Sequence, residues 1–174
     1  MRMTSRYGNS AQLRAFCVIC LFLFASVDAA SPDTPASSCW EGPVPEGVDP
    51  CKLINKGKDL TSSMGRQAEG LVRELASGLD VGRSLRVQEG LVREHLLWQY
   101  EDLTKRQVDA LVYAAVAERL GKTGEEMTVL RRELEKEDDP DKRRLLESIE
   151  LFRSQALTLL VRLSGELEEA DTTH

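Results

Sequence analysis

The chain has 174 residues, with 23 basic and 29 acidic side chains and a formal net charge of −6. A negative balance argues against binding to nucleic acid, whose phosphates would repel it, and against simple adhesion to anionic lipid. The length is enough for one domain with a hydrophobic core.

The N-terminus has the features of a secretory signal peptide. Residues 1–14 carry three arginines and no acidic residue, and the apolar run AFCVICLFLFA follows at residues 15–25. Small residues at positions 27 and 29 place the cleavage site between Ala29 and Ala30. The apolar run is too short for a stable membrane span, which takes about 20 residues. We therefore expect residues 1–29 to be removed and the mature protein to be soluble and secreted, either outside the cell or in the lumen of the secretory pathway.

Cysteine usage agrees with an oxidising compartment. Removal of residues 1–29, which carry three Arg and one Asp, leaves a chain of charge −8 with two cysteines, Cys39 and Cys51. Residues 30–49 are rich in Pro and Gly and predict an irregular arm. We predict that a Cys39–Cys51 disulfide ties this arm to the first helix and stabilises the fold by about 2–3 kcal/mol. No metal site is expected here, because neither histidine, His95 or His174, is near the cysteines in sequence.

From Asp49 onward the sequence has helical periodicity. Asp49 followed by Pro50 is a helix start, and apolar residues recur at steps of three and four to residue 79. A break near Gly57 is one alternative for this first segment. Gly and Asp residues at 78–82 predict a turn, and a second helix follows at about 84–101.

The next helix has the best-marked start. Thr104 and Gln107 fit a capping box. Gly121 predicts the end of this helix, and Thr123 with Glu126 predicts a second capping box that opens a short, highly charged helix.

The last helix is predicted to begin at Asp139-Pro140 and to continue to about Glu169, before a disordered tail at 170–174. Its apolar residues fall at 145, 149, 152, 156, 159, 163 and 167, which is a heptad pattern. Leu157 and Leu160 fall outside that seam. This helix is therefore either the central helix of a bundle or one with a second face that meets a partner.

Almost no strand pattern occurs along the chain. The sequence predicts an all-α fold, an antiparallel bundle of four to five amphipathic helices within residues 50–169, after the Pro/Gly-rich arm.

One hexapeptide, EGLVRE, occurs at Glu69–Glu74 and again at Glu89–Glu94. With a turn between the copies, each copy forms one helix and the connection that follows it. Equivalent residues of the two copies are then expected to be buried to the same extent in the bundle. We interpret this as an internal repeat. The small residues Gly70 and Gly90 are expected to let neighbouring helices approach closely.

No catalytic pattern was found, so we expect neither enzyme activity nor a cofactor. Gly121-Lys122-Thr123 resembles the end of a P-loop but lacks its first glycine and its preceding strand. His95 is expected to be a partly buried helix residue. The acidic cluster at 138–141 lacks the spacing and the glycine of a calcium loop and is interpreted as a solvated turn.

Two short strings resemble trafficking signals of pathogen proteins. Residues 83–86, Arg-Ser-Leu-Arg, resemble the RxLR motif of oomycete effectors. Arg143, Leu145 and Glu147 resemble the RxLxE motif of exported apicomplexan proteins. The resemblances cover only four or five residues and imply an exported effector as one further alternative.

The leading hypothesis is a secreted helical protein that acts by protein–protein contact with a partner of unknown identity. The main alternative is a secreted carrier of lipid or another apolar ligand, and self-association is compatible with either. Trp98, Tyr100 and Tyr113 are candidate interaction residues because aromatic anchors often dominate interfaces. Leu157 and Leu160 are two more candidates, because they lie outside the heptad seam on the face of the last helix that could meet a partner.

Overall fold

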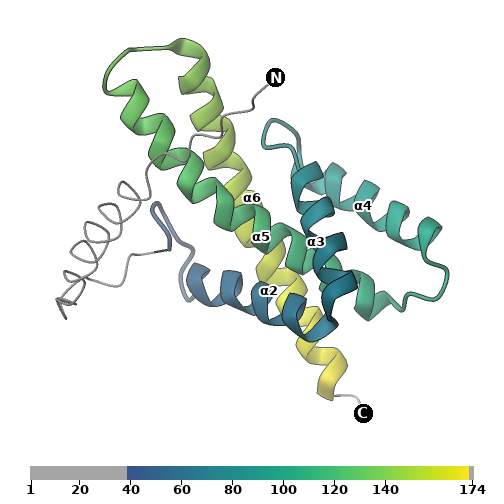
Figure 1. Ribbon diagram of the computed structural model, residues 1–174. Helices are drawn as coiled ribbons and strands as arrows, with labels where there is room; N and C mark the ends of the chain where they lie inside the picture. The colour runs from purple at the N-terminus through teal and green to yellow at the C-terminus, as the bar shows by residue number, and fades with distance from the viewer. Residues whose placement is uncertain (1–38, 173–174) are drawn as a thin grey trace, which may run out of the picture. The chain divides into compact units, whose positions relative to one another are not determined.

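A computed structural model describes residues 39–172, which form an all-α bundle (Figure 1). In this part of the chain there are five helices and no strand, as the sequence predicts. They are α2 (Pro50–Met64), α3 (Arg66–Gly78), α4 (Leu85–Gln99), α5 (Lys105–Leu134) and α6 (Pro140–Thr172). The predicted signal peptide and its cleavage site between Ala29 and Ala30 lie outside the described residues.

The arm and the first helix are joined as predicted. Cys39 and Cys51 form a disulfide with their Cα atoms 5.7 Å apart. Asp49 caps α2, and its side chain accepts hydrogen bonds from the backbone N–H groups of Cys51 and Lys52. Because the cap fixes where α2 begins, it also fixes the position of the disulfide on its first turn.

The arm also contacts the helices through two side chains. The Trp40 ring lies against the guanidinium of Arg153 in α6, 4.0 Å from ring centroid to Cζ. Glu41 pairs with Arg131 of α5 at 2.8 Å. Residues 39–41 are therefore held against α5 and α6 as well as to α2.

The break in the first helical segment falls at Gly65 and not near Gly57. Gly65 separates α2 from α3 and has φ +86°, in the left-handed region that favours glycine. Gly57 remains inside α2, where it faces α5: a Cβ at this position would lie 2.3 Å from the Cβ of Ala117. The helix tolerates Gly57 because the close contact with α5 requires a residue without a side chain.

The start of α5 is confirmed and its predicted end is wrong. Thr104 and Gln107 form the capping box at its first turn. The helix then continues through Gly121 to Leu134 as one element of 30 residues. Thr123, predicted as a second cap, is fully buried and donates its hydroxyl to the carbonyl of Leu120 while it accepts from Arg153. Tertiary packing therefore overrides the local stop signal.

The heptad seam of the last helix faces the core. Six of its seven positions, from Ile149 to Leu167, are buried, whereas Leu145 near the start of α6 is exposed. Asp139 caps the helix through hydrogen bonds from the backbone N–H groups of residues 141 and 142. The helix ends at Thr172 and not near Glu169, so residues 170–172 are helical and the prediction of a disordered tail from 170 is wrong for them.

The centre of the bundle is α5. This helix packs against α2, α3, α4 and α6, and its residues 108–117 are all buried. Leu157 and Leu160 of α6 are also buried, which explains why α6 is apolar around much of its circumference. Of the two alternatives for α6, the structure supports the one in which its second apolar face lies in the core, although the helix with the most neighbours is α5 and not α6.

The two EGLVRE copies lie in α3 and α4. Ala76 and Leu96, 20 residues apart, are both fully buried. The small residues do not behave as expected, because a Cβ at Gly70 or Gly90 would meet nothing within 4 Å. The close helix contact occurs at Gly57 instead, and the duplication itself stays a prediction.

Candidate interaction surface

Three of the five predicted interaction residues lie in the core. Tyr113 is fully buried and donates its hydroxyl to the backbone carbonyl of Leu53 at 3.0 Å. Burial, and to a lesser extent Glu168, raises the pKa of Tyr113. Leu157 and Leu160 are at most 1% exposed. These three residues therefore serve packing and are not available to a partner in the folded protein.

The other two predicted residues are at the surface, and Trp98 belongs to a larger apolar group. Its side chain is 84% exposed, and three more large apolar residues of α4 are more than half exposed: Val87, Leu91 and Leu97. At 3.6 residues per turn, Val87, Leu91 and Trp98 fall within about 40° of one another around the helix axis, with Leu97 on one flank. We call these four residues the α4 outer face. Of these four residues the sequence predicted only Trp98, because the burial of Val87, Leu91 and Leu97 cannot be read from the helix pattern alone.

The opposite side of α4 packs on the bundle. Leu85 and Leu96 are buried, and Val92 packs against the core. Gln88 is also buried: its amide donates to the carbonyls of Asp80 and Arg83, and its oxygen accepts from the backbone N–H of Asp80. Gln88 therefore fixes the turn between α3 and α4. A helix with apolar residues on both sides has one side in its own core and the other free for a second contact.

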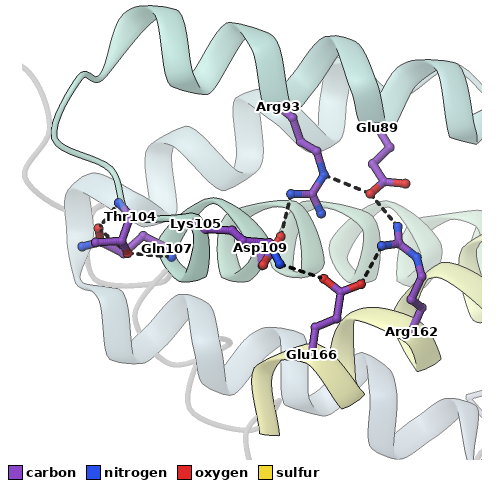
Figure 2. Close-up of polar contacts among 8 residues, drawn as sticks. All are labelled: Glu89, Arg93, Thr104, Lys105, Gln107, Asp109, Arg162 and Glu166. Carbon is purple, nitrogen blue, oxygen red and sulfur yellow. Dashed lines mark hydrogen bonds and ion pairs between the residues drawn. The ribbon is translucent and has the colours of Figure 1, made fainter. Parts of the chain in front are cut away.

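A network of ion pairs holds α4 to α5 and α6 (Figure 2). Arg93 of α4 donates to Asp109 of α5 at 2.5 Å and to Glu89 at 3.0 Å. Glu89 also accepts from Arg162 of α6 at 2.6 Å, and Arg162 donates to Glu166 at 2.8 Å. Asp109 is 4% exposed, and its charge is balanced by Arg93. The network therefore orients α4 so that its outer face points away from the bundle.

The network shifts the pKa values of its members. Burial alone would raise the pKa of Glu89, but hydrogen bonds from Arg162 and Arg93 outweigh it and lower the pKa. Burial likewise opposes the charge of Arg93, but its bonds to Asp109 and Glu89 raise the pKa. These shifts favour the charged forms of Glu89 and Arg93, and so favour the ion pair between them.

The charged residues near the α4 outer face are arranged by sign along the helix. Arg83 and Arg86 lie at the N-terminal end, whereas Glu94, Glu101 and Asp102 lie in the C-terminal half or just beyond it. The first turn has no acidic residue and the last turn has no basic residue. This order opposes the helix dipole, which favours acidic side chains at the N-terminus and basic ones at the C-terminus.

Tyr100 lies in a second apolar feature, a cleft of about 740 Å³ beside the α4–α5 connection. Tyr100 itself is 38% exposed. The other lining residues come from the α2–α3 junction, α3 and α5: Met64, Gln67, Ala68, Leu71, Leu103, Gln107 and Leu111. The volume and the mostly aliphatic lining are suited to a small apolar ligand.

The structure of residues 39–172 also shows where the remaining candidate residues of the sequence lie. There, no group of three or more His, Cys, Asp or Glu side chains is placed to hold a metal ion. His95 is exposed on α4, so the prediction that it is partly buried is wrong. Gly121, Lys122 and Thr123 lie inside the continuous helix α5 and not in a loop before a helix.

The two strings that resemble trafficking signals lie in or next to helices. Leu85 of the RxLR-like string is 1% exposed on the inner side of α4. Arg143, Leu145 and Glu147 lie in the first turns of α6, where all three are exposed. The helices in the described part of the chain include none that is long and apolar enough to cross a membrane.

Comparison with known proteins found no protein-family model, curated protein or solved structure that matches this chain.

Proposed function

We propose that this protein is a secreted helical protein that acts by protein–protein contact through the α4 outer face. The observation that supports the proposal is the grouping of Val87, Leu91 and Trp98 on the side of α4 that faces away from the core, with Leu97 on its flank; all four are at least 55% exposed. Single exposed apolar residues are common, but several large ones on one helix face are typical of interaction sites. Tryptophan is also the residue most enriched among interface residues that dominate binding energy.

Secretion is the other part of the proposal. It is supported by the basic, then apolar, then small-residue order of residues 1–29 and by the Cys39–Cys51 disulfide, since such bonds persist in oxidising compartments. N-terminal sequencing of protein recovered from the medium of producing cells tests it. We expect the first residue to be Ala30, and retention of Met1 on protein inside the cells would contradict secretion.

The contact is tested by photo-crosslinking in the fluid into which the protein is secreted. A photoreactive amino acid at position 91, on the α4 outer face, is compared with one at position 129 of α5, where Val129 is 51% exposed. We expect a discrete crosslinked product from position 91 only, and its loss when Trp98→Glu is added. Equal products from both positions, or none from position 91, would contradict the proposal.

The carrier function is a second candidate, favoured by the Tyr100 cleft. A fluorescent fatty acid is a suitable probe, with Leu103→Arg as the variant that places a charge in the cleft. Saturable binding that this variant abolishes, and that Trp98→Glu leaves unchanged, would support the carrier function over the contact through α4.

A further inference from the structure

We infer that the α4 outer face binds α4 of a second copy of this chain, antiparallel and about a two-fold axis. This inference rests on the proposed contact through the α4 outer face and adds the identity of the occupant. It is carried by the order of apolar and charged residues along α4.

The apolar residues have the spacing of a helix-pairing seam. Val87, Leu91, Glu94 and Trp98 follow at steps of four, three and four, and Glu94 is the one polar member. Such a 4-3-4 series is a heptad seam of the kind that pairs two helices. In an antiparallel pair centred between Leu91 and Glu94, Val87 of one copy lies opposite Trp98 of the other. Both ends of the contact are then apolar.

The charges favour the same arrangement. An antiparallel second copy places Arg86 near Glu101 of the other copy, and Arg83 near its Asp102. Arg83 has a weak, exposed pair with Asp80 at 3.3 Å, whereas no ion pair of Arg86, Glu101 or Asp102 occurs within residues 39–172. The charge order that opposes the dipole of a single α4 is therefore complemented when a second α4 runs in the opposite direction.

A partner of one charge sign fits this surface less well. A basic helix would match Glu94, Glu101 and Asp102 but would meet Arg83 and Arg86 at the other end, and an acidic helix has the reverse problem. A self-complementary surface under two-fold symmetry avoids both conflicts. Glu94 lies close to the axis in this arrangement, where its carboxylate approaches that of the second copy. The contact is therefore reversible and depends on protein concentration.

Sedimentation equilibrium on the full mature chain tests the inference. We expect a monomer–dimer equilibrium in which Trp98→Glu raises the dissociation constant roughly 30-fold or more, as the loss of an anchoring interface tryptophan does. Val129→Glu is the control, because it places the same charge at an exposed apolar position of another helix, α5, and is expected to leave the equilibrium unchanged. Glu94→Leu completes the apolar seam and is expected to tighten the dimer.

Charge reversal distinguishes a second copy from any other partner. Arg86→Glu and Glu101→Arg are each expected to weaken the dimer several-fold, and the double variant to restore it, because each residue faces the other across the two-fold axis. Circular dichroism checks that every variant is folded. A chain that stays monomeric at millimolar concentration, or a double variant weaker than both single ones, would overturn the inference.

The photo-crosslink at position 91 separates this inference from the proposed function. A product of twice the mass of the chain supports both. A product of any other mass leaves the contact through α4 standing and overturns the identity of the occupant. No product at any protein concentration overturns both.

Discussion

Gly57 lies at a point of the core where a larger residue does not fit without movement of α2 or α5. Besides Ala117, a Cβ there would contact the ring of Tyr113 at 3.7 Å. The sequence showed a glycine within a helical pattern, which indicates either a break or a close approach. Only the position of the partner helix, α5, distinguishes a helix break from a close approach. The sequence of residues 50–64 gives no information on where that partner lies.

Two glycine substitutions test this reading at the residue scale. Gly57→Ala is expected to destabilise the fold by about 1–3 kcal/mol, because the methyl group overpacks the contact with Ala117. Gly70→Ala in α3 is the matched control: its Cβ meets nothing within 4 Å, so better helix propensity is expected to stabilise the fold by roughly 0.5–1 kcal/mol. Urea unfolding of both variants measures the difference, and effects of the same sign would contradict it.

Glu89 predicts a pH dependence of stability. Its pKa is lower in the folded protein, because Arg162 and Arg93 hydrogen-bond its charged form. A carboxylate of this kind adds stability above the pKa it has in the unfolded chain, and this contribution is lost as pH falls through the folded value. We therefore expect Glu89→Gln to destabilise the fold at neutral pH and to matter progressively less in acid.

The measurement is the difference in unfolding free energy between the wild type and Glu89→Gln across the acidic range. Glu74→Gln on the exposed side of α3 is the control and should show no comparable trend. A difference for Glu89→Gln that grows as pH falls would contradict the role of the ion-pair network.

At the scale of elements, the sequence predicted where helices start more reliably than where they end. The starts at Asp49, Thr104 and Asp139 depend on side chains that bond to the next turn, so the local sequence contains the whole interaction. The predicted end at Gly121 depended on glycine alone, which permits a helix end without requiring one. Thr123 then joined the helix because Arg153, 30 residues away, supplies its second hydrogen bond.

The capping box of α5 gives a test at this scale. Thr104→Ala removes the acceptor for the backbone N–H of Gln107, at 3.2 Å, and is expected to destabilise the fold by about 1 kcal/mol. Thr128→Ala is the control, since Thr128 is exposed within the same helix and alanine has the better helix propensity. An unchanged urea midpoint for Thr104→Ala, with the slope preserved, would show that the box does not contribute.

The α4 outer face could not be predicted from the sequence of the helix alone. An apolar residue on a helix is most often in the core, so Val87, Leu91 and Leu97 gave no separate signal. The ion pairs and the buried residues of α4 show which side of the helix faces the bundle. Only then can Val87, Leu91 and Leu97 be recognised as exposed. The signal that could have found them is the presence of apolar residues on opposite sides of one short helix.

At the scale of the whole molecule, the all-α class followed from periodicity, but the central position of α5 did not. The run from 108 to 117 is almost entirely apolar, which predicts burial without saying which helices cover it. The sequence made α6 a candidate for this place because Leu157 and Leu160, outside its heptad seam, imply burial on more than one side. Which helix is central depends on contacts between elements that are far apart in the chain. The residue pattern within one helix does not predict those contacts.

Three substitutions in α6 test the core of the whole bundle. Leu157→Glu and Leu160→Glu each place an unpaired charge at a position at most 1% exposed, and are expected to remove several kcal/mol and the fold with it. Val161→Glu is the neighbouring control, because Val161 is 43% exposed. Circular dichroism should show unfolded chains for the first two and a native spectrum for the third. Folded monomers for Leu157→Glu and Leu160→Glu would contradict the packing of α6.

The continuity of α5 gives one helix two very different surroundings. Residues 108–117 are enclosed by four other helices, whereas beyond Met127 no residue of α5 is buried, and in Figure 1 its C-terminal part extends beside the start of α6. Backbone amides in the first part can exchange with solvent only when the bundle unfolds globally, whereas those near Leu134 need only a local opening of the helix pair. Hydrogen–deuterium exchange along this single helix is therefore expected to quicken steadily from residue 117 toward residue 134, without a step at Gly121.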